Sequence, residues 1–164
     1  KEYNFVFAGN LGKAQSLNTV LDTADLLKEK DNIGFVLIGD GSEKHILINQ
    51  ASKRNLRNII FIERQTAELM PSYFKKASAL LVTLSNNHVL NLTLPSKIQA
   101  YLSSGTPILA AINGISADIL IDSGAALVSP AEDAFAFRDL ILEFILLNLS
   151  IIVLICLPLK KNIF

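Results

Sequence analysis

Two short stretches of this sequence combine residue types that can bind an anion. The first is Pro95–Ser96–Lys97, which has the pattern of a helix start with a lysine in its first turn. Pro95 suits helix entry, Ser96 can cap free backbone N–H groups, and Lys97 adds charge where the helix dipole is already positive. A helix N-terminus of this kind is a natural phosphate site, although the same residues would also make an ordinary capped surface helix.

The second stretch is GNLGKAQ, residues 9–15. Gly9 and Gly12 would let the backbone approach a bulky anion, Asn10 lies between them, and Lys13 supplies a positive charge. The spacing matches neither GxGxxG nor GxxxxGK[ST], so the usual signatures of dinucleotide and ATP sites are missing. A tight turn explains this stretch equally well. A third glycine-rich stretch, GDGS at residues 39–42, favours a structural turn with Ser42 as a helix cap.

Residues that serve other chemistries are sparse. His45 and His88 have no partnered arrangement, the carboxylates show no acid–base pair, and the sequence predicts no metal site and no bound cofactor. Fifteen basic and fifteen acidic residues, with no tryptophan, argue against a nucleic-acid partner. The single cysteine, Cys156, cannot form an internal disulfide, which fits a reducing compartment and predicts a cytoplasmic location.

Apolar runs alternate with segments of helical periodicity along most of the chain. The predicted strands are 5–8, 33–38, 58–62, 79–83, 108–112 and 125–128, and the predicted helices are 17–30, 43–54, 66–76, 96–104, 117–122 and one from about 131. This alternation predicts an α/β fold, a Rossmann-like doubly wound parallel sheet of about six strands. Ligands of such sheets lie beyond the carboxyl ends of the strands, where this prediction also places Lys13 and Lys97.

The order of the motifs resembles a known family. The blocks are FAGNLGKAQ (7–15), FVLIGDGSE (35–43), NIIFIER (58–64), ALLVTL (79–84), LPSKIQAYLSSGTPILAA (94–111) and SGAALVSPAED (123–133). Together they resemble the C-terminal, donor-binding half of GT-B group 1 glycosyltransferases. The likeness is closest to the bacterial surface-polysaccharide and O-antigen enzymes, and it extends over residues 3–138.

The resemblance implies a nucleotide-diphospho-sugar donor, usually UDP-linked, and no metal. It places Gly9, Asn10, Gly12 and Lys13 near the diphosphate, Pro95, Ser96 and Lys97 at the helix start that holds it, and Arg64 beside the nucleobase. Lys13 and Lys97 would stabilise the charge on the leaving diphosphate. Many family members carry two glutamates where this chain has Leu92 and Ala100, so the ribose contact of the second is absent or passes to a neighbour such as Gln99.

We therefore expect residues 1–139 to form a nucleotide-sugar-binding domain, half of a GT-B fold. Residues 140–164 form an apolar end, which we interpret as a buried helix with a tail, a membrane-associated segment or a non-native terminus. Peripheral association with the inner face of the membrane is thus an open alternative.

Whether the chain is an enzyme by itself stays open at this point. The resemblance implies a hexosyltransferase fragment that binds its donor but transfers no sugar without an N-terminal acceptor domain. One alternative is a non-catalytic or split-enzyme module that needs a separate partner protein. A flavodoxin-like or NAD-binding domain is a weaker alternative, since a doubly wound sheet serves many functions.

Overall fold

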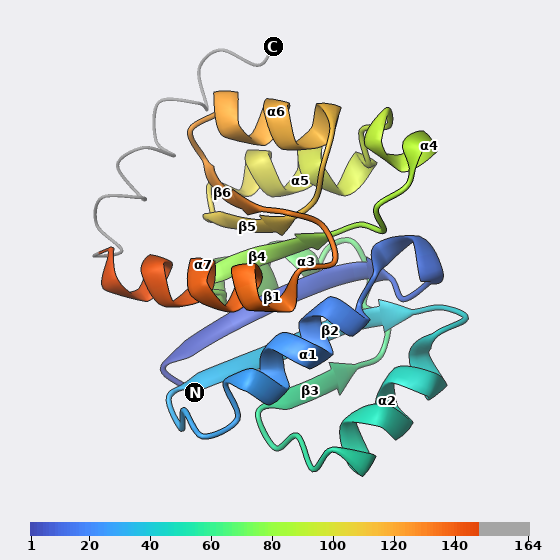
Figure 1. Cartoon of the computed structure of the whole chain (residues 1–164), viewed down its shortest axis with the longest axis vertical. Helices are drawn as coiled ribbons and strands as arrows, with labels where there is room; N and C mark the ends of the chain where they lie inside the picture. Colours follow the sequence, from blue (N-terminus) through green and yellow to red (C-terminus); the bar gives the residue numbers. More distant parts are fainter. Residues whose placement is uncertain (148–164) are drawn as a thin grey trace.

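A six-stranded parallel sheet forms the centre of the molecule (Figure 1). The computed structural model describes residues 1–147. Its strands are β1 (Tyr3–Asn10), β2 (Ile33–Asp40), β3 (Ile59–Ile62), β4 (Ala79–Thr83), β5 (Ile108–Ala111) and β6 (Ala126–Ser129). They lie in the order β3-β2-β1-β4-β5-β6, and every neighbouring pair is parallel. This confirms the predicted doubly wound sheet, in which the strand order reverses between β1 and β4.

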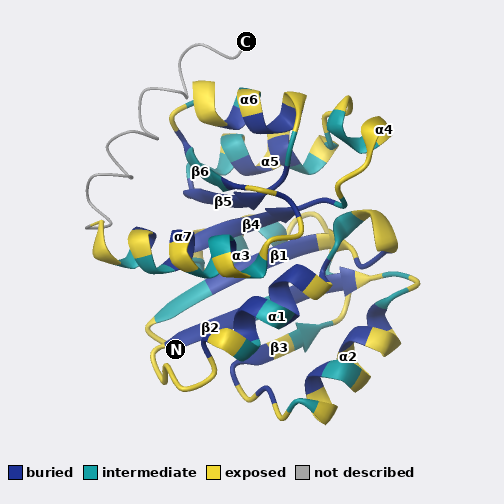
Figure 2. Cartoon of the chain, viewed as in Figure 1, coloured by how far each residue is buried: buried dark blue, intermediate teal, exposed yellow. Residues whose placement is uncertain are grey.

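Helices cover both faces of the sheet because neighbouring residues of each strand point to opposite sides. Phe5 and Phe7 of β1 belong to the apolar cluster under one layer of helices, whereas Val6 and Ala8 belong to the cluster under the other. The first layer contains α1 (Asn18–Leu26), α2 (Lys44–Lys53) and α7 (Ala134–Leu146). The second contains α3 (Met70–Lys76), α5 (Ser96–Ser104) and α6 (Ile115–Asp122). Figure 2 shows the strands buried between these layers.

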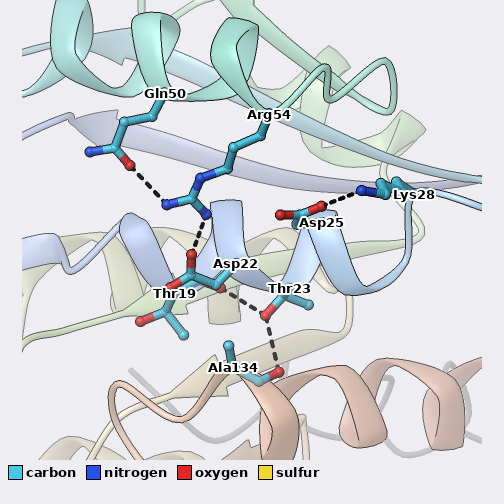
Figure 3. Close-up of polar contacts among 8 residues, drawn as sticks. All are labelled: Thr19, Asp22, Thr23, Asp25, Lys28, Gln50, Arg54 and Ala134. Atoms are coloured by element: carbon cyan, nitrogen blue, oxygen red, sulfur yellow. Dashed lines mark hydrogen bonds and ion pairs between the residues drawn. The ribbon is translucent and has the colours of Figure 1, made fainter.

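Polar contacts join the helices of the first layer (Figure 3). Arg54, which follows α2, donates hydrogen bonds to the Asp22 carboxylate of α1 and to the Gln50 side chain. On the other side of α1, the buried Thr23 hydroxyl lies 2.7 Å from the Thr19 carbonyl and 3.3 Å from the Ala134 carbonyl at the start of α7. These contacts set the position of α1 between α2 and α7.

Helix α7 continues across the expected boundary at residue 139. Leu140, Ile141 and Phe144 are buried, and the Phe144 ring packs edge-on against Phe5 of β1 at 6.0 Å between centroids. The first part of the apolar end, through Leu146, thus belongs to the packed domain. Residues 148–164, including the rest of the apolar end, lie outside the described residues. Through residue 147, no helix combines the length and apolar character needed to cross a bilayer.

Several predicted helix starts are wrong by a few residues. Pro95, in extended conformation, takes the N-cap position of α5, so Ser96 is already its first helical residue and is not the cap. Helix α3 begins at Met70 and not at residue 66, because Pro71 favours the first turn. Glu43, not Ser42, precedes α2. The predicted end of α5 is confirmed, since Gly105 adopts the left-handed conformation with φ 69°.

Candidate functional site

The central strands β1 and β4 separate toward their carboxyl ends. Their paired register covers Phe5 and Val6 opposite Ala79 and Leu80, although β1 continues to Asn10. In a doubly wound sheet, the point at which the strand order reverses is where a crevice opens for ligands. Helix α5, which follows β4 in the chain, lines this crevice through Lys97, Ala100 and Tyr101.

Tyr101 occupies the space where β4 no longer pairs with β1. Its hydroxyl accepts a hydrogen bond from the Ala8 N–H group (2.9 Å) and lies 3.1 Å from the Ala8 carbonyl, to which it can donate. Burial raises the pKa of Tyr101 well above its ordinary value, so the hydroxyl keeps its proton. The side chain therefore substitutes for a strand partner and ties α5 to β1. Sequence reasoning missed Tyr101, whose one local signal is its position one helical turn after Lys97.

Lys97 lies one helical turn earlier and lines the same crevice. Its Nζ atom donates a hydrogen bond to the side-chain oxygen of Gln15 and lies 3.8 Å from the centroid of the Phe7 ring. Within residues 1–147, no carboxylate lies within 4.0 Å of this Nζ atom. Burial lowers the pKa of Lys97 from 10.5 to about 7. A half-buried ammonium group without a counter-charge is a ready partner for an anionic ligand.

These elements enclose a pocket of about 510 Å³. It is lined by Ala8, Gly9, Asn10, Ile38, Gly39, Asp40, Arg64, Gln65, Met70, Phe74, Lys97, Ala100 and Tyr101. Apolar side chains thus line the pocket together with two cations, one carboxylate and two amides. This is the composition expected of a site for a mixed polar and apolar small molecule.

Glycines bring the first two strands close together at the edge of this pocket. A Cβ atom on Gly39 would lie 1.9 Å from the Gly9 carbonyl oxygen, and Gly39 has a φ of 148°. A Cβ atom on Gly41 would lie 2.5 Å from the Asn10 side-chain oxygen. Both positions therefore require glycine for close packing, which agrees with the predicted structural role of the GDGS turn.

The structure brings together four of the nine predicted site residues, namely Gly9, Asn10, Arg64 and Lys97. The other five, Gly12, Lys13, Pro95, Ser96 and Gln99, do not line the pocket. Gly12 is buried under the Asn10 side chain, whereas Lys13, Ser96 and Gln99 are exposed. Lys13 begins a short 3-10 helix, η1 (Lys13–Gln15), which precedes the longer helix that the sequence predicted from residue 17. The pocket also includes Asp40, Met70 and Phe74, which sequence reasoning did not select.

A second cavity, of about 710 Å³, lies between α1 and the start of α7. Its four carboxylates, Asp22, Asp25, Glu132 and Asp133, all have partners: Arg54, Lys28, the Ser16 hydroxyl and the Ala136 N–H group, respectively. Figure 3 shows two of these carboxylates, Asp22 and Asp25, with their partners Arg54 and Lys28. Within residues 1–147, no group of three or more acidic, histidine or cysteine side chains could hold a metal ion. The crevice around Lys97 is therefore the better candidate site.

A family model described as "Glycosyl transferases group 1" matches residues 1–150. The chain belongs to the group 1 glycosyltransferases. This confirms the resemblance stated from the sequence motifs. One relative of the chain is WcaI of Escherichia coli (strain K12), named as a colanic acid biosynthesis glycosyl transferase, which is 32% identical over 100 residues. Another is the glycosyltransferase WbjE of Pseudomonas aeruginosa, 29% identical over 153 residues.

The match to each relative covers only part of that protein. It takes in 61% of this chain but 24% of WcaI, and 89% of this chain but 36% of WbjE. The chain thus spans about a quarter to a third of the length of these two relatives.

Solved glycosyltransferase structures share the fold at low sequence identity. The catalytic domain of cholesterol-alpha-glucosyltransferase from Helicobacter pylori has a TM-score of 0.80 at 13% identity, over 99% of this chain and 97% of that one. The C-terminal domain of LpcC from Francisella tularensis, a group 1 family protein, has a TM-score of 0.76 at 16% identity, over 97% of this chain and 83% of that domain. TarM of S. aureus, solved in a complex that includes UDP, has a TM-score of 0.77 at 16% identity, over 99% of this chain and 32% of TarM.

Proposed function

We propose that this chain is the donor-binding half of a glycosyltransferase that uses a nucleotide-diphospho-sugar, with a UDP-sugar as the first candidate, to make bacterial cell-surface polysaccharide. The observation that carries the proposal is the half-buried Lys97 ammonium, which lines the pocket at the reversal point of the sheet and has no carboxylate partner among residues 1–147. The UDP complex of TarM and the colanic acid role in the name of WcaI support the choice of donor and product.

In this proposal the diphosphate lies against Lys97 and the turn at Gly9. The Lys97 charge stabilises the negative charge that grows on the leaving nucleoside diphosphate as the bond between the donor sugar and the diphosphate breaks. Arg64, exposed at the pocket after β3, lies beside the nucleobase. Lys13 is an exposed second cation on η1, whose long side chain would reach the ligand only from outside the pocket. We therefore expect Lys97 to contribute more than Lys13.

We assign the ribose hydroxyls to Asp40. It is the one carboxylate among the described residues that line the pocket, and Ala100 presents only a methyl group there. At the end of β2, Asp40 Oδ1 accepts a hydrogen bond from the Gly41 N–H group at 2.9 Å and lies 4.0 Å from Lys44 Nζ. A carboxylate at this strand end is well placed to accept hydrogen bonds from a pair of ribose hydroxyls.

Transfer of sugar requires an acceptor site as well as a donor site. Because the matched part makes up only 24% of WcaI and 36% of WbjE, we propose that the acceptor site belongs to a separate N-terminal domain or partner protein. This chain alone would then bind the donor without transferring its sugar. The donor chemistry fits a cytoplasmic reaction, at the inner face of the membrane if the acceptor is lipid-linked.

Isothermal titration calorimetry with UDP and UDP-sugars tests the proposal. Lys97→Ala should weaken UDP binding about 10- to 100-fold, the range expected for a charge-assisted hydrogen bond. Lys53→Ala, which removes an exposed lysine at the end of α2, is the matched control and should bind like the wild type. Lack of binding at millimolar UDP, or equal affinity in Lys97→Ala, would refute the assignment.

A further inference from the structure

Two elements besides α5, which carries Lys97, hold its ammonium group in place. From η1, the Gln15 side-chain oxygen accepts its hydrogen bond. From β1, the fully buried Phe7 presents its ring face 3.8 Å from Nζ, and a Cβ atom on Gly9 would lie 3.2 Å from Nζ. The amine of a long and flexible side chain is therefore confined to one place, at the end of β1.

Gln15 is itself held by the end of β4. The buried Thr83 hydroxyl donates a hydrogen bond to the Gln15 carbonyl. The Ser85 hydroxyl lies 2.9 Å from the Lys13 carbonyl, and the Ser85 N–H group donates to the Ala14 carbonyl at 3.0 Å. Thr83, the last residue of β4, and Ser85, two residues later, thus bind all three carbonyls of η1. These hydrogen bonds fix the backbone from which the Gln15 side chain extends.

The two contacts on Nζ share a chemical property. An amide oxygen and an aromatic face both attract an ammonium group, but neither carries a charge that would neutralise it. A carboxylate in the place of Gln15 would form a permanent ion pair with Lys97 and neutralise its positive charge. The other titratable side chains that line the pocket are Asp40, Arg64 and Tyr101, and none of the described carboxylates lies within 4.0 Å of Nζ.

We propose that Gln15 is a positioning residue: it holds the Lys97 ammonium group at the end of β1 without neutralising it, so that its charge stays available to the diphosphate of a nucleotide donor. The inference rests on the proposed function for its ligand, but the contact between Gln15 and Lys97 can be tested in the ligand-free chain. The lowered pKa of Lys97, about 7, agrees with a partner that carries no charge.

Gln15→Glu is the decisive variant, because it keeps the shape of the side chain and adds only a negative charge. We would follow Lys97 by NMR in protein with 13C-labelled lysine, with Lys97→Met for assignment, and measure UDP affinity by calorimetry at pH 6, 7.5 and 9. Gln15→Glu should raise the pKa of Lys97 by about 2 units or more. It should also weaken UDP binding about tenfold or more at pH 6 and flatten the pH dependence of binding from pH 6 to 9.

Gln65→Glu is the matched control, because it adds the same charge to the same pocket at a side chain whose hydrogen bond goes to the Glu63 carbonyl and not to Lys97. It should move the pKa of Lys97 by less than half as much, since a more distant charge is better screened. If Gln15→Glu leaves the Lys97 pKa unchanged, or if the two variants shift it equally, the positioning role is overturned even when UDP binds. If the wild type binds no UDP, the proposed function fails, and the ligand-free titration still decides whether Gln15 positions Lys97.

Discussion

Replacing Lys97 by methionine should stabilise the folded chain at pH 6, although it removes the central residue of the proposed site. Methionine keeps most of the apolar length of lysine and can pack on the Phe7 ring. What it removes is a charged group that folding transfers out of water without supplying a counter-charge. Active-site groups often have this cost, because a ligand supplies the missing partner.

The size of the expected stabilisation follows from the shift in the pKa of Lys97 from 10.5 to about 7. Each unit corresponds to about 1.4 kcal/mol, so below pH 7 the penalty on the charged form is at most about 5 kcal/mol. Methionine also loses the contact of the cation with Phe7 and the hydrogen bond to Gln15, together about 1–3 kcal/mol. We therefore expect Lys97→Met to raise the free energy of unfolding by about 1–3 kcal/mol at pH 6.

The advantage of the variant should disappear as the pH rises. Between pH 7 and 10.5 the unfolded chain keeps the Lys97 proton that the folded chain has lost, so wild-type stability rises with pH. The slope of this contribution is at most about 1.4 kcal/mol per pH unit. Above pH 10 the wild type should equal or exceed the variant, because its neutral amine keeps the hydrogen bond to Gln15.

Urea unfolding followed by circular dichroism at pH 6, 7.5, 9 and 10 measures these differences. Lys53→Met, at an exposed site on α2, is the control and should stay within about 0.5 kcal/mol of the wild type at each pH. A stability difference between Lys97→Met and the wild type that does not change with pH would refute the reasoning. It would mean that the Lys97 charge is well solvated in the folded chain.

Two further predictions concern residues that the sequence did not single out. Tyr101→Phe should lower the free energy of unfolding by about 1–3 kcal/mol, because it leaves the N–H and carbonyl groups of Ala8 without their partner, and a change below about 0.5 kcal/mol in urea unfolding would contradict this. Asp40→Asn should weaken the binding of UDP about 3- to 10-fold but leave that of 2′,3′-dideoxy-UDP nearly unchanged, as for the loss of one polar contact. Equal losses for the two ligands in calorimetry would rule out a ribose contact at Asp40.

The sequence alone determined the class of fold and the edge at which the site lies. Apolar runs such as residues 33–38 predict strands buried on both faces, and the helical periodicities between them predict crossovers. Local conformational limits also place some boundaries well: Gly105 ends α5 because it adopts the left-handed conformation readily. Since all parallel strands present their carboxyl ends to one edge, the position of Lys97 after β4 was sufficient to place it near Gly9.

Other boundaries depend on partners elsewhere in the chain. The glycines after Ala8 predict an early turn, yet β1 continues to Asn10 because it pairs residue by residue with β2 as far as Asp40. Likewise, the turn at Lys13 forms a 3-10 helix whose carbonyls are bound by Thr83 and Ser85, about 70 residues further along the chain. No local pattern carries the information for such pairings.

The geometry of the site was decided by tertiary structure. The contacts that define it join residues far apart in sequence: Gln15 with Lys97 is separated by 82 positions and Ala8 with Tyr101 by 93. They exist because the strand order brings β1 beside β4 and because these strands then separate. The backbone groups of Ala8 then bind Tyr101 of α5, and the ammonium group of Lys97 binds Gln15 of η1. The residue types made an anion site conceivable, but packing among β1, η1 and α5 decides that Lys97 is buried against an amide and an aromatic ring, with no carboxylate partner in the described part of the chain.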